Sequence, residues 1–147
     1  MFNERGSSLT VLMVIDGQGG GIGKVIIKKL RDAFGEELEI LALGTNSVAT
    51  SQMMKAGANR GATGENAVIT MAPKVDIIIG PVAILMANSM MGEITSGIAQ
   101  AISSSNALKI LIPLTQENAK IVGVSNEPLP HLIDQVIEII KGGDKNV

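Results

Sequence analysis

The chain alternates between short apolar runs and longer stretches in which apolar residues recur every three or four positions. Leu9–Ile15 is an apolar run, which is typical of a strand buried on both faces of a parallel sheet. Ile22, Ile26, Leu30 and Phe34 then recur every four residues, with charged residues between them. This spacing predicts an amphipathic helix. The first 34 residues therefore read as a buried strand followed by a surface helix.

The same alternation continues along the rest of the chain. The further strands expected are 38–43, 58–63, 75–80, 109–114 and 120–124. The further helices expected are 47–56 capped by Ser47, 65–71, a largely helical stretch 82–104 with a break and a new N-cap at Thr95 and Ser96, and a last helix that begins at Pro130. Strand and helix alternate in units of about thirty residues, which predicts an α/β fold.

The expected architecture is one Rossmann-like, doubly wound domain over residues 1–147. Its mainly parallel sheet has five or six strands, with helices on both faces. We expect the strand order 3-2-1-4-5-6. The segment Lys55–Gly80 decides this order: if the 75–80 strand lay directly beside the first strand, the flavodoxin-like order 2-1-3-4-5 would hold instead.

The junction between the first strand and the first helix is unusually rich in glycine. Five of the seven residues from Gly17 to Gly23 are glycine. Bare backbone allows close approach of an anion, and the N-terminus of the following helix offers free N–H groups and a partial positive charge. A tight turn with close packing would need only one or two glycines, so the loop favours a bound ligand. Its predicted contacts are Asp16, Gly17, Gln18, Gly19, Gly20, Gly21, Ile22 and Gly23.

The spacing of these glycines can be compared with the motifs of known ligand-binding loops. Gly17, Gly21 and Gly23 fit G-x-x-x-G-x-G, which resembles the glycine signature of short-chain dehydrogenases and implies NAD(P) on a Rossmann fold. The chain has no tyrosine for the Tyr-x-x-x-Lys pair of that family and is much shorter than its enzymes. Gly23 and Lys24 match the end of a P-loop, but Val25 replaces its hydroxyl residue. The sequence from Asp16 onward partly matches the cobalamin-domain motif D-x-H-x-x-G, with Gln18 in place of the histidine.

A second resemblance covers almost the full length. The segments IDGQGGGIGK, GTNSVATSQMMKAGA, GATGENA, IIIGPVAILMANSMMGEIT and KILIPL resemble a family of short bacterial proteins of unknown function. That resemblance implies a single Rossmann-like domain and no particular activity.

Polar loops follow several of the expected strands, where ligands bind in open α/β folds. Thr45, Asn46 and Ser47 follow the second strand and could contact a ligand or form only a cap and a turn. Gly80 and Pro81 end the fourth strand, and 115–118 and 125–127 follow the last two. Asp16 could bind a ligand hydroxyl or only the N–H groups of its own turn.

Several further polar residues are candidates for a ligand-binding or catalytic role. Glu65, Asn66, Asn88, Glu93 and Thr95 lie in small or apolar stretches, and Glu65 with Glu93 could form a carboxylate pair, although both could also be helix-start carboxylates. Arg60 could reach an anionic ligand or face solvent, and we expect His131 to face solvent. No cluster has metal-ligand spacing.

Composition narrows the function classes. The 147 residues carry a net charge of −2, no cysteine and only two aromatic residues, so we expect no nucleic-acid partner. The longest uncharged run is too short for a membrane span, and the N-terminus lacks the plan of a secretion signal, so we expect a cytoplasmic protein without a membrane partner. Hydrophobic content is 46%, from which we expect a homodimer or larger homo-oligomer through Ile84–Met91 and the long helical region after it, which carry little charge.

Three interpretations of function remain. The first, which we favour, is a domain that binds a small anionic ligand at Gly17–Gly23, either a nucleotide or dinucleotide such as NAD(P) or a phosphorylated metabolite. The second is a small enzyme that acts on such a ligand through Asp16 or a glutamate. The third is an oligomeric scaffold in which the glycine loop has lost its ligand.

Overall fold

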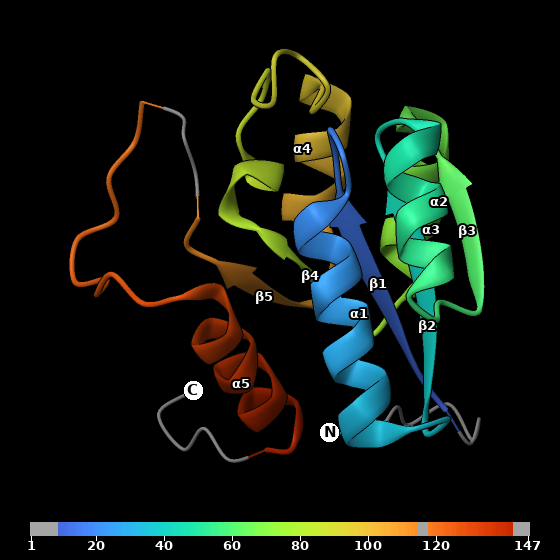
Figure 1. Ribbon diagram of the computed structural model, residues 1–147. Coiled ribbons are helices and arrows are strands. Elements are labelled where there is room, and N and C mark those ends of the chain that lie inside the picture. The colour runs from blue at the N-terminus through green and yellow to red at the C-terminus, as the bar shows by residue number, and fades with distance from the viewer. Residues whose placement is uncertain (1–8, 115–117, 143–147) are drawn as a thin grey trace.

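Strands and helices alternate along the whole described chain in the computed structural model, which describes residues 9–114 and 118–142 (Figure 1). The strands are β1 (Thr10–Asp16), β2 (Leu38–Gly44), β3 (Arg60–Thr63), β4 (Ile77–Pro81) and β5 (Leu108–Ile112). The helices are α1 (Gly21–Phe34), α2 (Ser47–Lys55), α3 (Glu65–Met71), α4 (Ser96–Ser104) and α5 (Leu129–Ile140), with short 3-10 turns η1 (Ala72–Lys74) and η2 (Val82–Leu85).

The five strands form one parallel sheet in the order β3-β2-β1-β4-β5. The expected α/β class and the order of these five strands are confirmed. β4 does lie directly beside β1, so the criterion given above for the flavodoxin-like order is wrong, because both orders place these two strands together. The short strand β3, paired with β2 on the far side from β1, excludes the flavodoxin-like order. Since all strands are parallel, their carboxyl ends meet at one edge of the sheet. The helices α1 and α2 begin at that edge.

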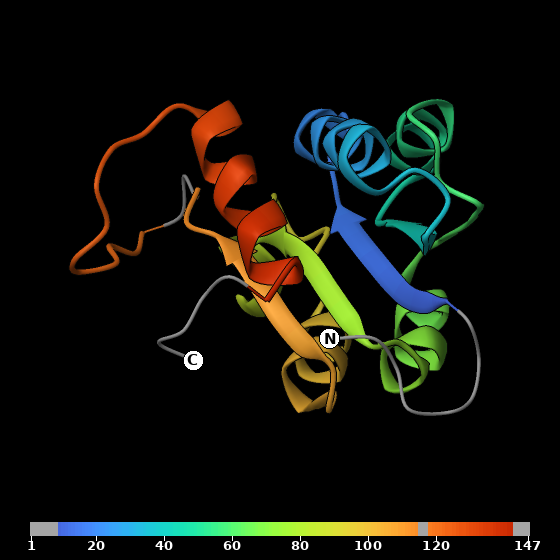
Figure 2. The same ribbon diagram turned by 90° about the horizontal axis from the view of Figure 1, so that it is seen from below.

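Helices cover both faces of the sheet (Figure 2). Alternate residues of β1 point to opposite sides: Leu12 and Val14 pack with α1, α2 and α5, whereas Met13 and Ile15 pack with α3 and α4. All four of these side chains are fully buried. The nearly unbroken apolar strands of the sequence are thus explained by a sheet with two covered faces.

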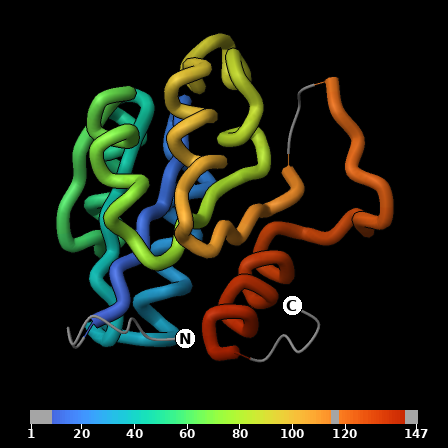
Figure 3. The backbone as a smooth tube through the Cα atoms, turned by 180° about the vertical axis from the view of Figure 1, so that it is seen from behind, coloured from blue at the N-terminus to red at the C-terminus, as the bar shows by residue number. Residues whose placement is uncertain are grey.

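The sixth strand expected at 120–124 is wrong. This segment belongs to the long connection between β5 and α5, whose described part, 118–128, arches away from the sheet (Figure 3). Gly123 has a φ of +87°, outside the extended region that a strand requires, and Val122 is 98% exposed. The β-branched residues of the segment led to the prediction, but no strand pairs with the outer edge of β5 in the described part of the chain.

The stretch 82–104 is helical only at its two ends. Between η2 and α4 the chain turns repeatedly, with positive φ at Asn88, Met90, Met91 and Gly92. The new N-cap is confirmed, because the hydroxyl of Thr95 accepts a hydrogen bond from the N–H of Ile98. We refer to residues 86–95 as the η2–α4 loop.

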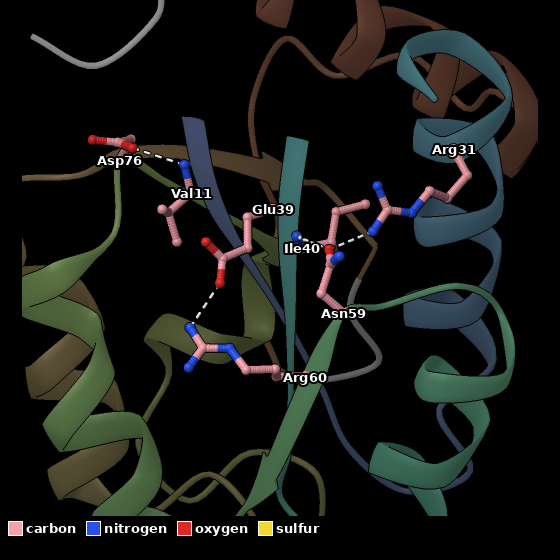
Figure 4. A network of polar contacts seen from close by, with 7 residues as sticks. All are labelled: Val11, Arg31, Glu39, Ile40, Asn59, Arg60 and Asp76. Atoms are coloured by element: carbon pink, nitrogen blue, oxygen red, sulfur yellow. Dashed lines mark hydrogen bonds and ion pairs between the residues drawn. The ribbon is translucent and has the colours of Figure 1, made fainter. Parts of the chain in front are cut away.

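A polar network ties the other end of α1 to the sheet (Figure 4). The guanidinium of Arg31 donates hydrogen bonds to the carbonyl oxygens of Gly57, Gly35 and Leu38 and to Oδ1 of Asn59. The same Asn59 oxygen accepts from the N–H of Ile40. This network fixes α1, β2 and the start of β3 relative to one another at the edge opposite the glycine loop.

Candidate functional site

Two glycines of the loop are required by packing between α1 and α2. Gly20 has a φ of +75°, and a Cβ there would lie 2.8 Å from Cα of Ala49. A Cβ on Gly23 would lie 2.5 Å from the sulfur of Met53. The loop itself closes with a hydrogen bond from the N–H of Gly20 to the carbonyl of Gly17. Part of the glycine signal therefore comes from close helix packing.

Gly19 and Gly21 have no such explanation. No heavy atom lies within 4 Å of a Cβ built on either residue, and neither has a positive φ. Both are exposed, and their N–H groups make no hydrogen bond to any residue that the structure describes. Gly21 is the first residue of α1, so its N–H lies at the positive end of the helix.

Asp16 closes the carboxyl end of β1 and is only 3% exposed. Its Oδ1 accepts from the N–H of Gly17 at 2.8 Å, and its Oδ2 accepts from the N–H of Gly23 at 2.6 Å. Burial raises the pKa of Asp16 above its ordinary value, although these backbone hydrogen bonds act in the opposite direction. Of the two roles expected for Asp16, the observed bonds are those of its own turn.

Glu93, from the η2–α4 loop, lies directly against the glycine loop. One of its oxygens, Oε1, accepts from the N–H of Gln18 at 2.8 Å, the hydroxyl of Thr45 at 2.5 Å and Nδ2 of Asn46 at 2.9 Å. Burial acts to raise the pKa of Glu93, but these three hydrogen bonds outweigh it and the pKa is lowered. We call the three donors the Glu93 cradle.

Gly17 is a glycine because this cradle is so close. A Cβ on Gly17 would lie 2.6 Å from Oγ1 of Thr45, 2.7 Å from the sulfur of Met90 and 3.0 Å from Oε1 of Glu93. Gln18, next to it, has a positive φ of 49°. Any side chain at residue 17 would push the η2–α4 loop away from the glycine loop.

The residues after β2 have divided roles. Asn46, rather than Ser47, is the N-cap of α2: its Oδ1 accepts from the N–H of Ala49. Its Nδ2 donates to the carbonyl of Gln18 as well as to Glu93. Ser47 is exposed at the start of α2. Thr45 and Asn46 therefore bind the glycine loop together with Glu93, and Ser47 faces solvent beside them.

The remaining predicted contacts are packing residues. Gly80 and Pro81 are buried within β4, where a Cβ on Gly80 would lie 2.7 Å from the carbonyl oxygen of Ile15. Ile22 is half-buried against the core on the α1 side of the sheet. None of the three presents a polar side chain to the edge where Glu93 lies.

Other polar candidates lie apart from the glycine loop. Glu65 accepts from the hydroxyl of Thr95 instead of facing Glu93, whose charge acts on Asp16. Arg60 forms an exposed ion pair with Glu39. His131 is exposed in the first turn of α5. Residues 115–117, part of the loop expected after β5, lie outside the described residues.

A groove lies away from the glycine loop, on the α5 side of the sheet. About 480 Å³ of space lies between β5, α5 and the 118–128 connection, lined mainly by apolar side chains such as Ile112, Ile121 and Val124. Within the described residues, no three His, Asp or Glu side chains are grouped as a metal site would need. No helix in that part of the chain is both long and apolar enough to cross a membrane.

Sequence reasoning missed the partnership between Glu93 and the glycine loop. The two are 75 residues apart, and Glu93 was expected near a helix start, where a carboxylate has a local explanation. The available signal is Gly92, because glycine favours turns that need a positive φ, and Gly92 has a φ of +91°. The position of Glu93 in the sequence does not by itself identify the glycine loop as its partner.

The strand order and the glycine loop together define a Rossmann-like α/β domain with its candidate site at the carboxyl edge of the sheet. The chain belongs to the family described as a domain of unknown function, DUF3842, which matches residues 11–144. No curated protein matches this chain. Among solved structures, it is similar to a universal stress protein in complex with cAMP, at 16% identity and a TM-score of 0.43, over 72% of this chain and 98% of the other.

Proposed function

We propose that this protein binds a small anionic ligand, a nucleotide or a phosphorylated metabolite, at the carboxyl edge of β1 and β2. The observation that carries the proposal is the open side of the glycine loop. Gly19 and Gly21 expose N–H groups without hydrogen-bond partners among the described residues, with clear space in front of them. Packing explains the other glycines of the loop but not these two.

Backbone N–H groups suit a phosphate because they leave room for its oxygens and lie next to the positive end of a helix. Asp16 offsets part of that helix charge, so the affinity depends on the free donors and on Lys24. Lys24 is exposed in the first turn of α1. Ser47, exposed at the start of α2, would contact the sugar or another polar part of the ligand.

We limit the proposal to binding and do not extend it to catalysis by Asp16. Both oxygens of Asp16 accept backbone hydrogen bonds, and the side chain is buried. Accepting a proton from a substrate would break the bonds that hold the turn between β1 and α1. Asp16 therefore supports the loop rather than the chemistry of a ligand.

The test is calorimetric titration with NAD(H), NADP(H), ATP and inorganic phosphate. We expect at least one of them to bind, and Gly21→Val to weaken that binding at least tenfold because its side chain fills the space in front of the loop. Ser103→Val is the matched control, since it introduces the same valine side chain at an exposed position near the C-terminus of α4, away from the glycine loop.

Thermal melting of both variants checks that they fold. If none of the four compounds binds the wild type, and native mass spectrometry finds no co-purified ligand, the proposal is wrong. Equal binding by the wild type and a folded Gly21→Val would show that the ligand lies elsewhere.

A further inference from the structure

We propose that the carboxylate of Glu93 is an internal anion, which occupies one end of the anion site and leaves when the ligand's phosphate binds. The inference rests on the function proposed above and adds a competitor built into the chain. It gives Glu93 a role that neither its position in the sequence nor packing explains.

The chemistry of the Glu93 cradle is that of an anion site. A backbone N–H, a hydroxyl and a side-chain amide converge on Oε1 of Glu93, and all three are neutral donors. They come from two separate loops, after β1 and after β2. Several neutral donors directed at one oxyanion are a common way for proteins to bind an anionic group.

This cradle is continuous with the free N–H groups of the glycine loop. Gln18, whose N–H is bound to Glu93, directly precedes Gly19, whose N–H is unbonded among the described residues. A phosphate has several oxygens and would span both donors. The negative charge of Glu93 at Gln18 would then repel it, so the phosphate and the carboxylate exclude each other.

The loop that carries Glu93 is anchored on both sides of a turn with an unusual backbone. Met90 and Met91 have positive φ, which side-chain-bearing residues adopt only at a cost. On either side, Ser89 and Ile94 are buried, and the hydroxyl of Ser89 donates to the carbonyl of Ala83. Departure of Glu93 requires only the loss of the three bonds to its Oε1, which rotation of the half-buried side chain achieves while the backbone bonds of Gly92 and Glu93 within the loop stay in place.

The test uses inorganic phosphate as the probe and does not depend on a nucleotide. Glu93→Ala empties the cradle, and we expect its melting temperature to fall and then to be restored by millimolar phosphate. The wild type should respond at least tenfold less sensitively, because its own carboxylate competes. The control is Glu65→Ala, which removes a carboxylate bonded to Thr95 in the neighbouring region and should gain no such phosphate response.

Glu93→Gln provides the second arm, since it keeps the size of the side chain and removes the charge. We expect it to bind phosphate at least tenfold more tightly than the wild type in calorimetry. Equal affinity in a folded Glu93→Gln overturns the inference, as does a phosphate response of Glu93→Ala no greater than that of Glu65→Ala. If the two Glu93 variants respond to phosphate but the wild type binds no nucleotide, the internal anion is supported and the nucleotide proposal fails.

Discussion

The N–H of Gly23, in the first turn of α1, donates a 2.6 Å hydrogen bond to the carboxylate of Asp16, at the end of β1. The carboxylate therefore links the end of the strand to the start of the helix across the glycine loop. We expect Asp16→Ala to lower the free energy of unfolding by about 3 kcal/mol, because it leaves the N–H groups of Gly17 and Gly23 without acceptors. Urea denaturation measures this loss. A loss below about 1 kcal/mol would mean that the cost of burying the charge cancels these hydrogen bonds.

The glycines of the loop should differ sharply in their tolerance of a methyl group. Gly20→Ala should destabilise the protein by about 2 kcal/mol or more, because its φ is positive and its Cβ would meet the backbone of Ala49. Gly19→Ala, whose Cβ meets nothing within 4 Å, should change stability by less than about 0.5 kcal/mol. Parallel thermal denaturation of the two variants compares them. Equal losses would contradict the division of the loop into packed and open glycines.

The two carboxylates at the site should respond to pH in opposite directions. The native pKa of Glu93 is lowered, so its stabilising contribution is present above its ordinary value of 4.5 and is lost as pH falls through the native pKa. The native pKa of Asp16 is raised, so its contribution is present below 3.8 and is lost as pH rises through the raised value.

Glu93→Gln isolates the first of these effects. The stability difference between wild type and Glu93→Gln should favour the wild type near pH 7 and shrink towards pH 3, in urea titrations at several pH values. Asp16→Asn should show the opposite trend relative to the wild type. A difference for Glu93→Gln that does not vary with pH would contradict the assigned hydrogen bonds.

Self-association through Ile84–Met91 and the region after it stays a prediction, and the structure indicates a second exposed apolar surface. Within Ile84–Met91, Ile84 is fully buried, and the exposed apolar surface there is concentrated in Met91. Ile121, Val122 and Val124 are exposed beside the outer edge of β5. We expect a homo-oligomer by light scattering at micromolar concentration, and Val122→Asp to dissociate it. A monomeric wild type, or dissociation only by Met91→Asp, would contradict this surface.

The strands β1, β2 and β4 were predictable from the sequence because burial on both faces leaves a clear apolar pattern. The short strand β3, whose four residues are exposed, was predicted only from the helix end and the turn that precede it. The 65–71 helix was predicted at its observed bounds. Alternation and right-handed connections fit two strand orders, and the prediction of a short strand at 58–63 selected the observed one. The strand at 120–124 failed, since an apolar β-branched run does not reveal whether a partner edge covers it. Apolar periodicity alone cannot separate a solvated connection from an edge strand.

The candidate site was predictable only in part, because its residues come together through tertiary contacts. Gly19 and Gly21 and the residues after β2 lie where the strand–helix pattern places them. Glu93 reaches them through turns with positive φ at Met90 and Met91, which side-chain-bearing residues do not signal in a sequence. Long-range polar contacts of this kind depend on loop conformation rather than on local pattern.

The hydrogen bonds of Arg31 have a consequence for how the molecule opens in its native state. The side chain of Arg31, near the end of α1, donates hydrogen bonds to the start of β2 and to the turn before β3. These elements should therefore unfold as one cooperative unit and exchange their amide hydrogens together. None of these hydrogen bonds of Arg31 goes to α5, which contacts the rest of the domain through one apolar face and an exposed ion pair between Asp134 and Lys29 of α1. The amides of α5 should exchange through a separate, lower-energy opening, which divides the domain into a late-opening βαβ unit and an early-opening C-terminal helix.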